Sequence, residues 1–300
     1  MPPKRATLTG MRKREELTAW LFISPIALGI LIFQLYPTLF SFYISFTTWN
    51  LLTPPKWVGL SNYVGLFTTD RFFKNTMTNT ATYAGWTVII GLVLGLFFAA
   101  LLNQDIRGKY LYRAIYFVPV VAPTVAVAIL WQVLYEPNFG VFNGILRMVG
   151  IKGPNWLGNS TWAMRSIIFE AIWAGLGFTV LIFLAGLQGI SQEYYEAAEI
   201  DGANFIQKFF FITLPLLSPT TFFLLVTGVI GSFQVFDIPY IMTGGGPANA
   251  TQMVIMYLYN LAFTTQRMGI ASAVASIVFI LIILLTIVNF RLSKSWVFYE

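Results

Sequence analysis

Side chains able to do covalent or acid–base chemistry are scarce in this sequence. Its 300 residues include no cysteine and no histidine, which excludes disulfides, thiol nucleophiles, imidazole bases and most zinc or haem sites. The twelve acidic residues are scattered, so no carboxylate metal site is expected. A Gly-x-x-x-x-Gly-Lys-Ser/Thr sequence, which cradles the phosphates of ATP, does not occur either. We therefore predict a non-enzymatic chain with no catalytic residue, cofactor or metal of its own.

One acidic segment in the second half of the chain has informative spacing. Ser191 suits a helix N-cap, with Glu193 in the first turn. On the short helix that follows, Ala197 and Ala198 form a surface with little bulk. Gly202 can adopt the positive φ that is needed where a helix stops and the chain reverses. The segment predicts a short helix that ends in a tight turn.

A second short helix is predicted after this turn, and it runs towards Pro215, which suits the first turn of a further helix. Phe205, Phe209 and Ile212 recur at helical spacing, so one face of this helix is apolar and costly to leave in water. Together the two helices would form a projecting hairpin, acidic at its tip and apolar at its base. Such a shape indicates a socket on a partner.

Polar side chains inside apolar segments form a second set of candidate residues, because such groups are costly in lipid and usually face a cavity. Glu170 lies three residues before Trp173, on the same helix face. Carboxylate or amide groups beside aromatic rings suit a sugar, whose hydroxyls need partners while its C–H faces stack on rings. The predicted solute path comprises Glu170, Trp173, Phe233, Gln234, Phe236 and Asp237.

These residues also have purely structural interpretations. Glu170 could pair with Arg165 or with a partner subunit, and Trp173 could simply pack against its neighbours. Asp237 could start a loop. The sequence leaves both kinds of interpretation open.

The elements that must position these residues are membrane helices. The chain is 57% hydrophobic and 10% charged, against about 25% charged in soluble domains. A helix needs about 20 apolar residues to cross the hydrocarbon core. We predict an all-α, polytopic membrane protein, with a basic amino end over 1–16 and one transmembrane domain over 17–300. Its six expected spans are 17–46, 76–102, 112–135, 163–187, 214–236 and 268–290.

The distribution of positive charge predicts the orientation. Lys and Arg are more frequent at the amino end and in the alternate connections that would lie on the same side, which favours cytoplasmic termini. The hairpin segment, 188–213, then also lies in the cytoplasm. Pro119 and Pro123 should bend the third span, and the apolar piece 251–263 is too short to cross, so we place it flat at the outer surface.

The hairpin segment resembles the EAA loop of the permeases of binding-protein-dependent ABC importers. The resemblance is carried by the run Glu196-Ala197-Ala198, three residues, Gly202, nine residues, Ile212, one residue, and Leu214-Pro215. It implies that the loop forms a coupling helix that enters a cleft on an ATPase subunit. The ATPase-coupling residues then comprise Glu196, Ala197, Ala198, Asp201, Gly202, Phe205, Phe209, Ile212, Leu214 and Pro215.

Further stretches along nearly the whole chain resemble the sugar-permease branch of that family, which includes MalF-like and glycerol-phosphate or lactose permease-like subunits. They include Ser24-Pro25, Tyr36-Pro37, 58–63, Trp131 with 135–137, and 244–247. The resemblance implies the transmembrane fold of type I ABC importers and the translocation of a sugar, oligosaccharide or related polyol. The chain lacks the extra amino-terminal spans and the large outer domain of the maltose protein, so its substrate is not carried over.

The same resemblance implies partners. They are a second permease subunit in a heterodimer, an ATPase dimer that binds ATP and Mg, an extracytoplasmic solute-binding protein, and the lipid of a bacterial or archaeal inner membrane; no nucleic acid is expected. Three alternatives remain open: a substrate other than a sugar, a self-contained secondary carrier, and a membrane anchor or assembly factor whose hairpin merely recruits a partner.

Overall fold

The computed structural model describes residues 8–104 and 108–298, and this part of the chain is almost entirely helical. The predicted basic amino end, 1–16, is thus described only from Leu8, and its Lys4 and Arg5 lie outside the described residues. The elements are α1 (Leu8–Ile30), a π-helical turn (Leu31–Leu35), α2 (Tyr36–Ser45), β1 (Thr47–Thr48), β2 (Lys56–Trp57), α3 (Ser61–Thr68), α4 (Arg71–Leu102), α5 (Lys109–Val121), α6 (Thr124–Leu134), α7 (Val141–Met148), α8 (Ser160–Gly189), α9 (Gln192–Ile200), α10 (Phe205–Lys208), a π-helical turn (Phe209–Thr213), α11 (Leu214–Leu216), α12 (Ser218–Phe233), α13 (Asp237–Thr243), α14 (Val254–Tyr259), a π-helical turn (Asn260–Thr264) and α15 (Met268–Ser293).

Four helices in the described part of the chain are long and apolar enough to cross a membrane, and two bent pairs raise the number of candidate spans to six. The four are Arg12–Ser45, Arg71–Leu102, Ser160–Gly189 and Met268–Ser293. The expected all-helical, polytopic fold is confirmed. The division into a basic end and one transmembrane domain stays a prediction.

The third apolar segment is not one straight span. It forms α5 and α6, whose axes differ by 108°. Pro123 lacks a backbone N–H and disfavours the α conformation in the preceding residue, and Ala122 accordingly has extended angles, with φ −75° and ψ 141°. The fifth segment is also broken, with 60° between Phe205–Leu216 and Ser218–Phe233. The bend predicted for the 112–135 segment is present after α5, beside Pro123, whereas Pro119 lies within α5.

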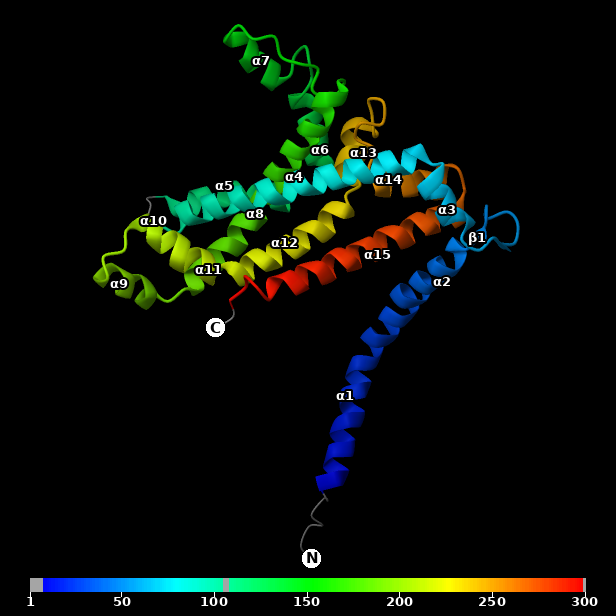
Figure 1. The fold of residues 1–300 in the computed structure, drawn as a ribbon, viewed down its shortest axis with the longest axis horizontal. Helices are drawn as coiled ribbons and strands as arrows, with labels where there is room; N and C mark the ends of the chain where they lie inside the picture. The colour runs from blue at the N-terminus through cyan, green and yellow to red at the C-terminus, as the bar shows by residue number, and fades with distance from the viewer. Residues whose placement is uncertain (1–7, 105–107, 299–300) are drawn as a thin grey trace, which may run out of the picture.

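The centre of the bundle is built on α4, which packs along α8 and α12, while α5 packs on α8. In Figure 1, α4, α12 and α15 run as long neighbouring rods. Phe183 of α8 and Leu217, just before α12, are almost fully buried at this centre together with Ala99 of α4. The interior contacts are therefore made largely by small and branched apolar residues.

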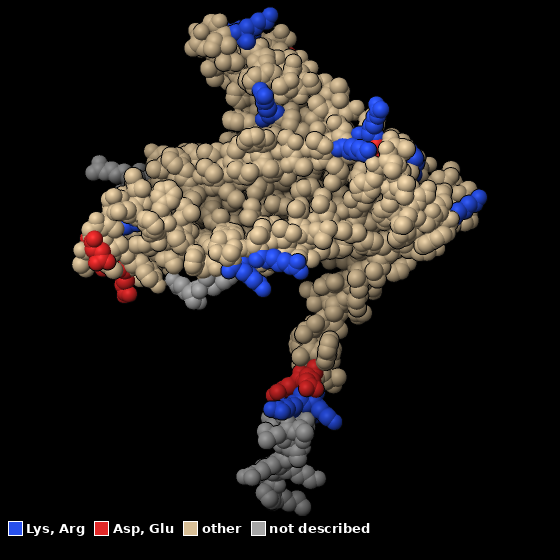
Figure 2. Space-filling model, in the orientation of Figure 1, with Lys and Arg blue, Asp and Glu red and all other residues tan. Residues whose placement is uncertain are grey.

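Helix α1 and the π-helical turn after it form a separate arm, which α2 joins to the bundle by packing along α15. Figure 1 shows it leaving the bundle, and no residue in the apolar window of Arg12–Ser45 is buried. Trp20 and Phe22 are among its exposed apolar side chains. Figure 2 shows the arm's own charged side chains towards its far end, with the length between them and the bundle apolar. An apolar arm of this length needs lipid or another protein chain as cover.

The contact between α5 and α8 depends on Gly177, and this gives a stability prediction. A Cβ atom on Gly177 would collide with the Tyr116 backbone carbonyl and the Val120 side chain. Gly177→Ala should therefore destabilise the protein by about 1–3 kcal/mol through overpacking. Gly175→Ala, two residues away, would meet nothing within 4 Å. Thermal unfolding of the detergent-solubilised variants measures the difference, and equal melting temperatures for the two would contradict the close contact.

Candidate functional site

The predicted hairpin is present as α9 and α10. Ser191 caps α9 by accepting the Glu193 N–H, and Gly202 ends the turn with φ +81°. The Ala203 N–H donates to the Ala198 carbonyl at 2.8 Å, which closes the turn. Asn204 then starts α10 with a capping box shared with the side chain of Gln207. Local hydrogen bonds therefore fix both ends of the hairpin.

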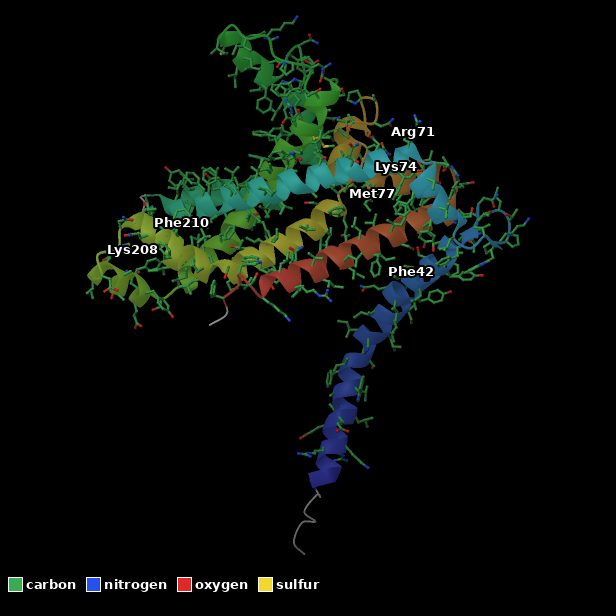
Figure 3. The ribbon with its side chains drawn as sticks, viewed as in Figure 1. Phe42, Arg71, Lys74, Met77, Lys208 and Phe210 are labelled. Carbon is green, nitrogen blue, oxygen red and sulfur yellow. The ribbon has the colours of Figure 1, made fainter. Side chains whose placement is uncertain are left out.

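Two side-chain contacts tie the hairpin to its base. Lys208 forms a 2.6 Å ion pair with Glu199, and the Tyr195 hydroxyl lies 2.9 Å from the Thr213 hydroxyl. Figure 3 places Lys208 at the same end of the molecule as Phe210. These contacts join α9 to the helix that continues into α11, and α11 leads into α12 after Leu217.

The hairpin exposes apolar side chains that no described part of the chain covers. Ile200 is 88% exposed and Phe211 is 78% exposed, and Phe205 is exposed as well. Ile212 and Phe211 border a hollow of about 330 Å³ behind Gly202. Glu196, Ala197, Asp201 and Leu214 are also exposed, whereas Ala198, Phe209, Ile212 and Pro215 are partly buried. The hairpin presents both a projection and an apolar surface to a partner.

A polar groove lies between α4, α8 and α12. Its volume is about 270 Å³, and its walls include Tyr83, Thr87, Ala171, Gly231 and Ser232. The hydroxyls of Thr87 and Ser232 lie 3.3 Å apart across it. Small residues on α12 leave the groove open, because a Cβ atom on Gly231 would meet nothing within 4 Å. The groove offers hydroxyl groups in an otherwise apolar bundle.

Glu170 lies next to this groove and is fully buried, at 0% exposure. Within the described part of the chain, neither of its carboxylate oxygens has a hydrogen-bond partner, and no ion pair joins it to Arg165. The Arg165 guanidinium instead lies 5.3 Å from the centre of the Trp162 ring. The indole N–H of Trp131 is likewise buried without a partner. Buried polar groups without partners are costly, so these two are the leading candidates for function in the interior.

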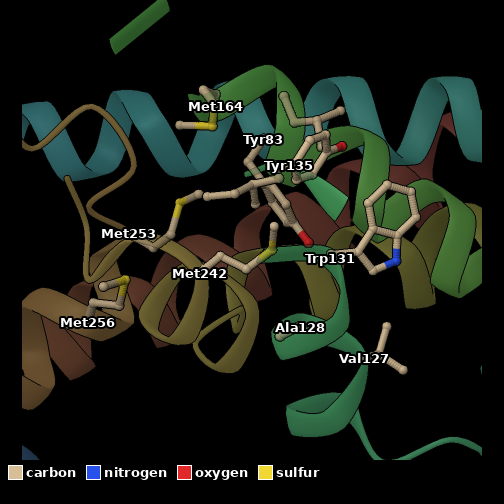
Figure 4. Packing of buried hydrophobic residues seen from close by; sticks show 11 residues of the cluster. Tyr83, Val127, Ala128, Trp131, Tyr135, Met164, Met242, Met253 and Met256 are labelled. Atoms are coloured by element: carbon tan, nitrogen blue, oxygen red, sulfur yellow. The ribbon is translucent and has the colours of Figure 1, made fainter. Parts of the chain in front are cut away.

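Aromatic rings and methionines surround this region. Figure 4 shows Tyr83, Trp131 and Tyr135 in one cluster with Met164, Met242 and Met253. Trp131 is the centre of the aromatic contacts, with ring centres 5.3 Å from both Tyr135 and Trp173. The interior thus combines hydroxyl groups, a lone carboxylate and flat apolar rings.

The other predicted path residues lie in different places. Trp173 contacts Trp131 and lines a different groove, on α4 and α8, and Phe233 is buried at the end of α12. Gln234 and Asp237 are exposed at the junction of α12 and α13, and Phe236 stacks on Tyr240. The structure therefore brings Glu170 close to the groove and places the α12–α13 residues at its end, around Val235, which lines it.

Sequence reasoning missed the groove residues Thr87, Gly228, Gly231 and Ser232. The available signal was small and hydroxyl residues at helical spacing on α12, with Thr87 and Gly91 four apart on α4. That pattern is the same for residues that pack against a helix and for residues that line an opening. Only the tertiary arrangement separates the two.

The loop after α6 is organised by one asparagine. The Asn143 amide donates to the carbonyls of Pro137 and Pro154, and the Trp156 indole N–H donates to its oxygen at 2.8 Å. The backbone N–H of Phe139 donates to Glu136 and holds the pKa of that carboxyl below its usual value. The loop and α7 therefore form a fixed platform.

The fold and site define a multi-span helical subunit with a projecting hairpin and a polar groove. The chain matches the family described as binding-protein-dependent transport system inner membrane component over residues 91–297. It is 39% identical over 292 residues to the probable ABC transporter permease protein YesP of Bacillus subtilis (strain 168), covering 96% of this chain and 94% of the relative. It is 35% identical over 285 residues to the trehalose/maltose transport system permease protein MalF of Thermococcus litoralis, covering 95% and 96%. The chain belongs to this family of inner membrane permease components.

The fold is also that of a solved transporter. A chain in the crystal structure of a bacterial alginate ABC transporter, in complex with an alginate pentasaccharide-bound periplasmic protein, superposes with a TM-score of 0.84 at 24% identity. The match covers 97% of this chain and 98% of that chain. The family and the fold agree with the resemblance drawn from the hairpin, and they make the chain a multi-pass inner membrane transport subunit rather than an enzyme.

Proposed function

We propose that this chain is the transmembrane permease subunit of an ATP-driven importer that translocates a sugar, oligosaccharide or related polyol. The observation that carries the proposal is the exposed α9–α10 hairpin, which is fixed to the base of α12 while α12 itself lines the polar groove. A push on the hairpin would reach the groove through packed helices. The relatives add the substrate class, since the Thermococcus litoralis protein is a trehalose/maltose transport permease.

The hairpin is the proposed docking site of an ATPase. In this role Glu196, Ala197, Ala198, Asp201 and Gly202 form the inserted tip. The exposed apolar residues at the base of the hairpin, which include Phe205 and Leu214, would be buried against the ATPase. ATP and Mg bind on the partner ATPase dimer. When nucleotide binding or hydrolysis moves the ATPase, the hairpin of this chain moves with it.

The remaining partners follow from two further surfaces. The apolar arm formed by α1 and the π-helical turn after it would pack on a second, different permease subunit, because no residue in its apolar window is buried within the bundle. The platform held by Asn143 would receive an extracytoplasmic solute-binding protein. This arrangement requires both termini and the hairpin in the cytoplasm of a bacterium or archaeon, as the charge distribution indicates.

The solute path is proposed to run through the groove beside Glu170. Thr87, Ser232 and the Tyr83 ring offer hydroxyl partners and a flat surface, the two features that bind a sugar. Glu170 and Trp131 would supply further polar partners once the helices move. Phe233, Gln234, Phe236 and Asp237 would act at the margin of the path rather than in the groove itself, and Trp173 would contribute through its contact with the Trp131 ring.

Reconstitution tests the proposal. The chain is co-expressed with the proteins encoded beside it, and uptake of labelled trehalose or maltose is measured in proteoliposomes. Uptake that needs both ATP and a solute-binding protein is the expected result. Uptake by the chain alone under an ion gradient would instead favour a secondary carrier, and a chain that binds an ATPase without moving any solute would favour an anchor.

Blocking the groove gives a sharper prediction. Tryptophan at Gly231 would project into open space, so Gly231→Trp should leave folding intact and reduce uptake at least about tenfold, equivalent to about 1.4 kcal/mol on the barrier. Gly85→Trp is the matched control, since Gly85 also has open space around it but lies outside the groove. Normal uptake by Gly231→Trp would exclude this groove as the path.

A further inference from the structure

A second and larger groove lies on α4 and α8 and shares no residue with the solute groove. Its volume is about 840 Å³, and every residue that lines it belongs to one of these two helices. The helices are in direct contact beneath it, since a Cβ atom on Gly95 of α4 would collide with Thr179 of α8. The groove is therefore a furrow along a helix pair on the flank of the bundle.

The lining of this furrow changes in character from one end to the other. Its polar side chains are Thr82, Thr161 and Arg165, which lie towards the start of α8 and in the first half of α4. Beyond them the walls are apolar and aromatic, with Leu94 and Leu176 near the far end. From Arg165 to Leu176 the helix rises about 16 Å, close to half of the hydrocarbon core of about 30 Å. The furrow therefore spans about one leaflet.

Arg165 provides a positive charge at one end of the furrow that can bind an anion. Within the described ranges its guanidinium takes part in no ion pair, and it is exposed beside the furrow, held over the Trp162 ring. A guanidinium at this position presents a fork of donors that matches a phosphate. Trp86 lines the same furrow and Trp162 lies under the guanidinium, and tryptophan is a residue that favours the membrane interface.

We propose that the furrow binds an anionic phospholipid, with its phosphate on Arg165 and an acyl chain along the apolar walls between α4 and α8. A lipid matches the furrow in three respects: one cationic end, an apolar remainder and the length of one leaflet. An apolar polypeptide helix would match the walls of the furrow but would leave Arg165 without an anion, so it fits only one of these three features. The bound lipid would seal α4 against α8 and stiffen the wall of the transport bundle.

Lipid retention tests the proposal without any measurement of transport, so its failure would leave the proposed transport role untouched. The full transporter is equilibrated in vesicles of phosphatidylethanolamine and phosphatidylglycerol, purified in mild detergent, and its retained lipids are measured by native mass spectrometry. The unmodified protein should retain phosphatidylglycerol in preference to phosphatidylethanolamine. Arg165→Gln should reduce the retained phosphatidylglycerol about tenfold, the effect of losing one charge-assisted hydrogen bond to phosphate.

Matched variants separate the furrow from general effects on folding. Leu94→Trp fills the furrow and should reduce retention of both lipids, whereas Val93→Trp, on an exposed part of α4 outside the furrow, should retain them. Arg147→Gln removes a charge from α7 and should change nothing. Undiminished phosphatidylglycerol in Arg165→Gln would overturn the proposal. So would a photoreactive group at position 94 that cross-links to another polypeptide chain instead of to lipid.

Discussion

Valine at position 202 is expected to uncouple ATP hydrolysis from solute uptake while the bundle stays folded. Gly202 has φ +81°, a conformation that a β-branched residue adopts only at a cost of about 1–3 kcal/mol. No neighbour lies within 4 Å of a Cβ atom there, so the effect comes from the backbone and not from a collision. The turn between α9 and α10 must therefore adopt another backbone conformation, which changes the orientation of α9 relative to α10.

The expected size of this effect follows from geometry. A misplacement of about 1 Å at a site that must align can cost about a hundredfold in rate, and we expect a loss of that order in ATP-driven uptake by Gly202→Val. Asn tolerates positive φ better than other residues with a Cβ atom, so Gly202→Asn should retain more activity than the valine variant. Proteoliposome uptake and solute-stimulated ATP hydrolysis are measured together.

Gly189→Val is the control for this series. Gly189 ends α8, is exposed, has open space around it and does not have a positive φ. It should therefore transport normally and melt at the same temperature as the unmodified chain. Equal uptake by Gly202→Val and Gly189→Val would show that the turn conformation does not matter for coupling, and the hairpin would lose its assigned role.

The hairpin was predictable because its determinants are local. Ser191 as an N-cap and Gly202 at a chain reversal follow from hydrogen bonding and backbone freedom within a few residues, and the structure has both. The bend in the third apolar segment was predictable for the same reason, since Pro123 acts on its own neighbour. Its size, 108°, was not, because the packing of α6 against α13 determines the direction of the chain after the break.

The interior of the site depends on contacts between distant segments, which spacing does not reveal. Thr87 meets Ser232 only because α4 packs on α12.

The short apolar piece 251–263 illustrates the same limit. Its length correctly excludes a span, but Val254 and Met256 are buried against the bundle, so it is an integral part of the core rather than a surface helix alone. The place of this piece relative to the membrane surface stays a prediction.

Leucine at position 170 is expected to make the protein more stable and less active. Both oxygens of Glu170 are buried without a partner, and an unsatisfied buried polar group costs about 1–3 kcal/mol. Leucine has a similar volume and removes that cost, so the melting temperature of Glu170→Leu should rise by about 2–4 °C for each kcal/mol recovered. A costly group at full burial is a sign of function, because intramembrane carboxylates are rarely structural.

The loss of transport in the same variant is what connects Glu170 to function. If its carboxylate gains a partner only when solute enters or the helices move, Glu170→Leu should reduce uptake at least about tenfold. The uptake rate of Glu170→Gln should lie between those of the unmodified chain and Glu170→Leu. Ile167→Val, one turn away and equally buried, should do the opposite, with about 0.5–1.5 kcal/mol less stability and normal uptake. If Glu170→Leu is stabilised and still transports at the full rate, the carboxylate has no role in transport. The proposed solute path would then have only the hydroxyls of Thr87 and Ser232 as its polar partners.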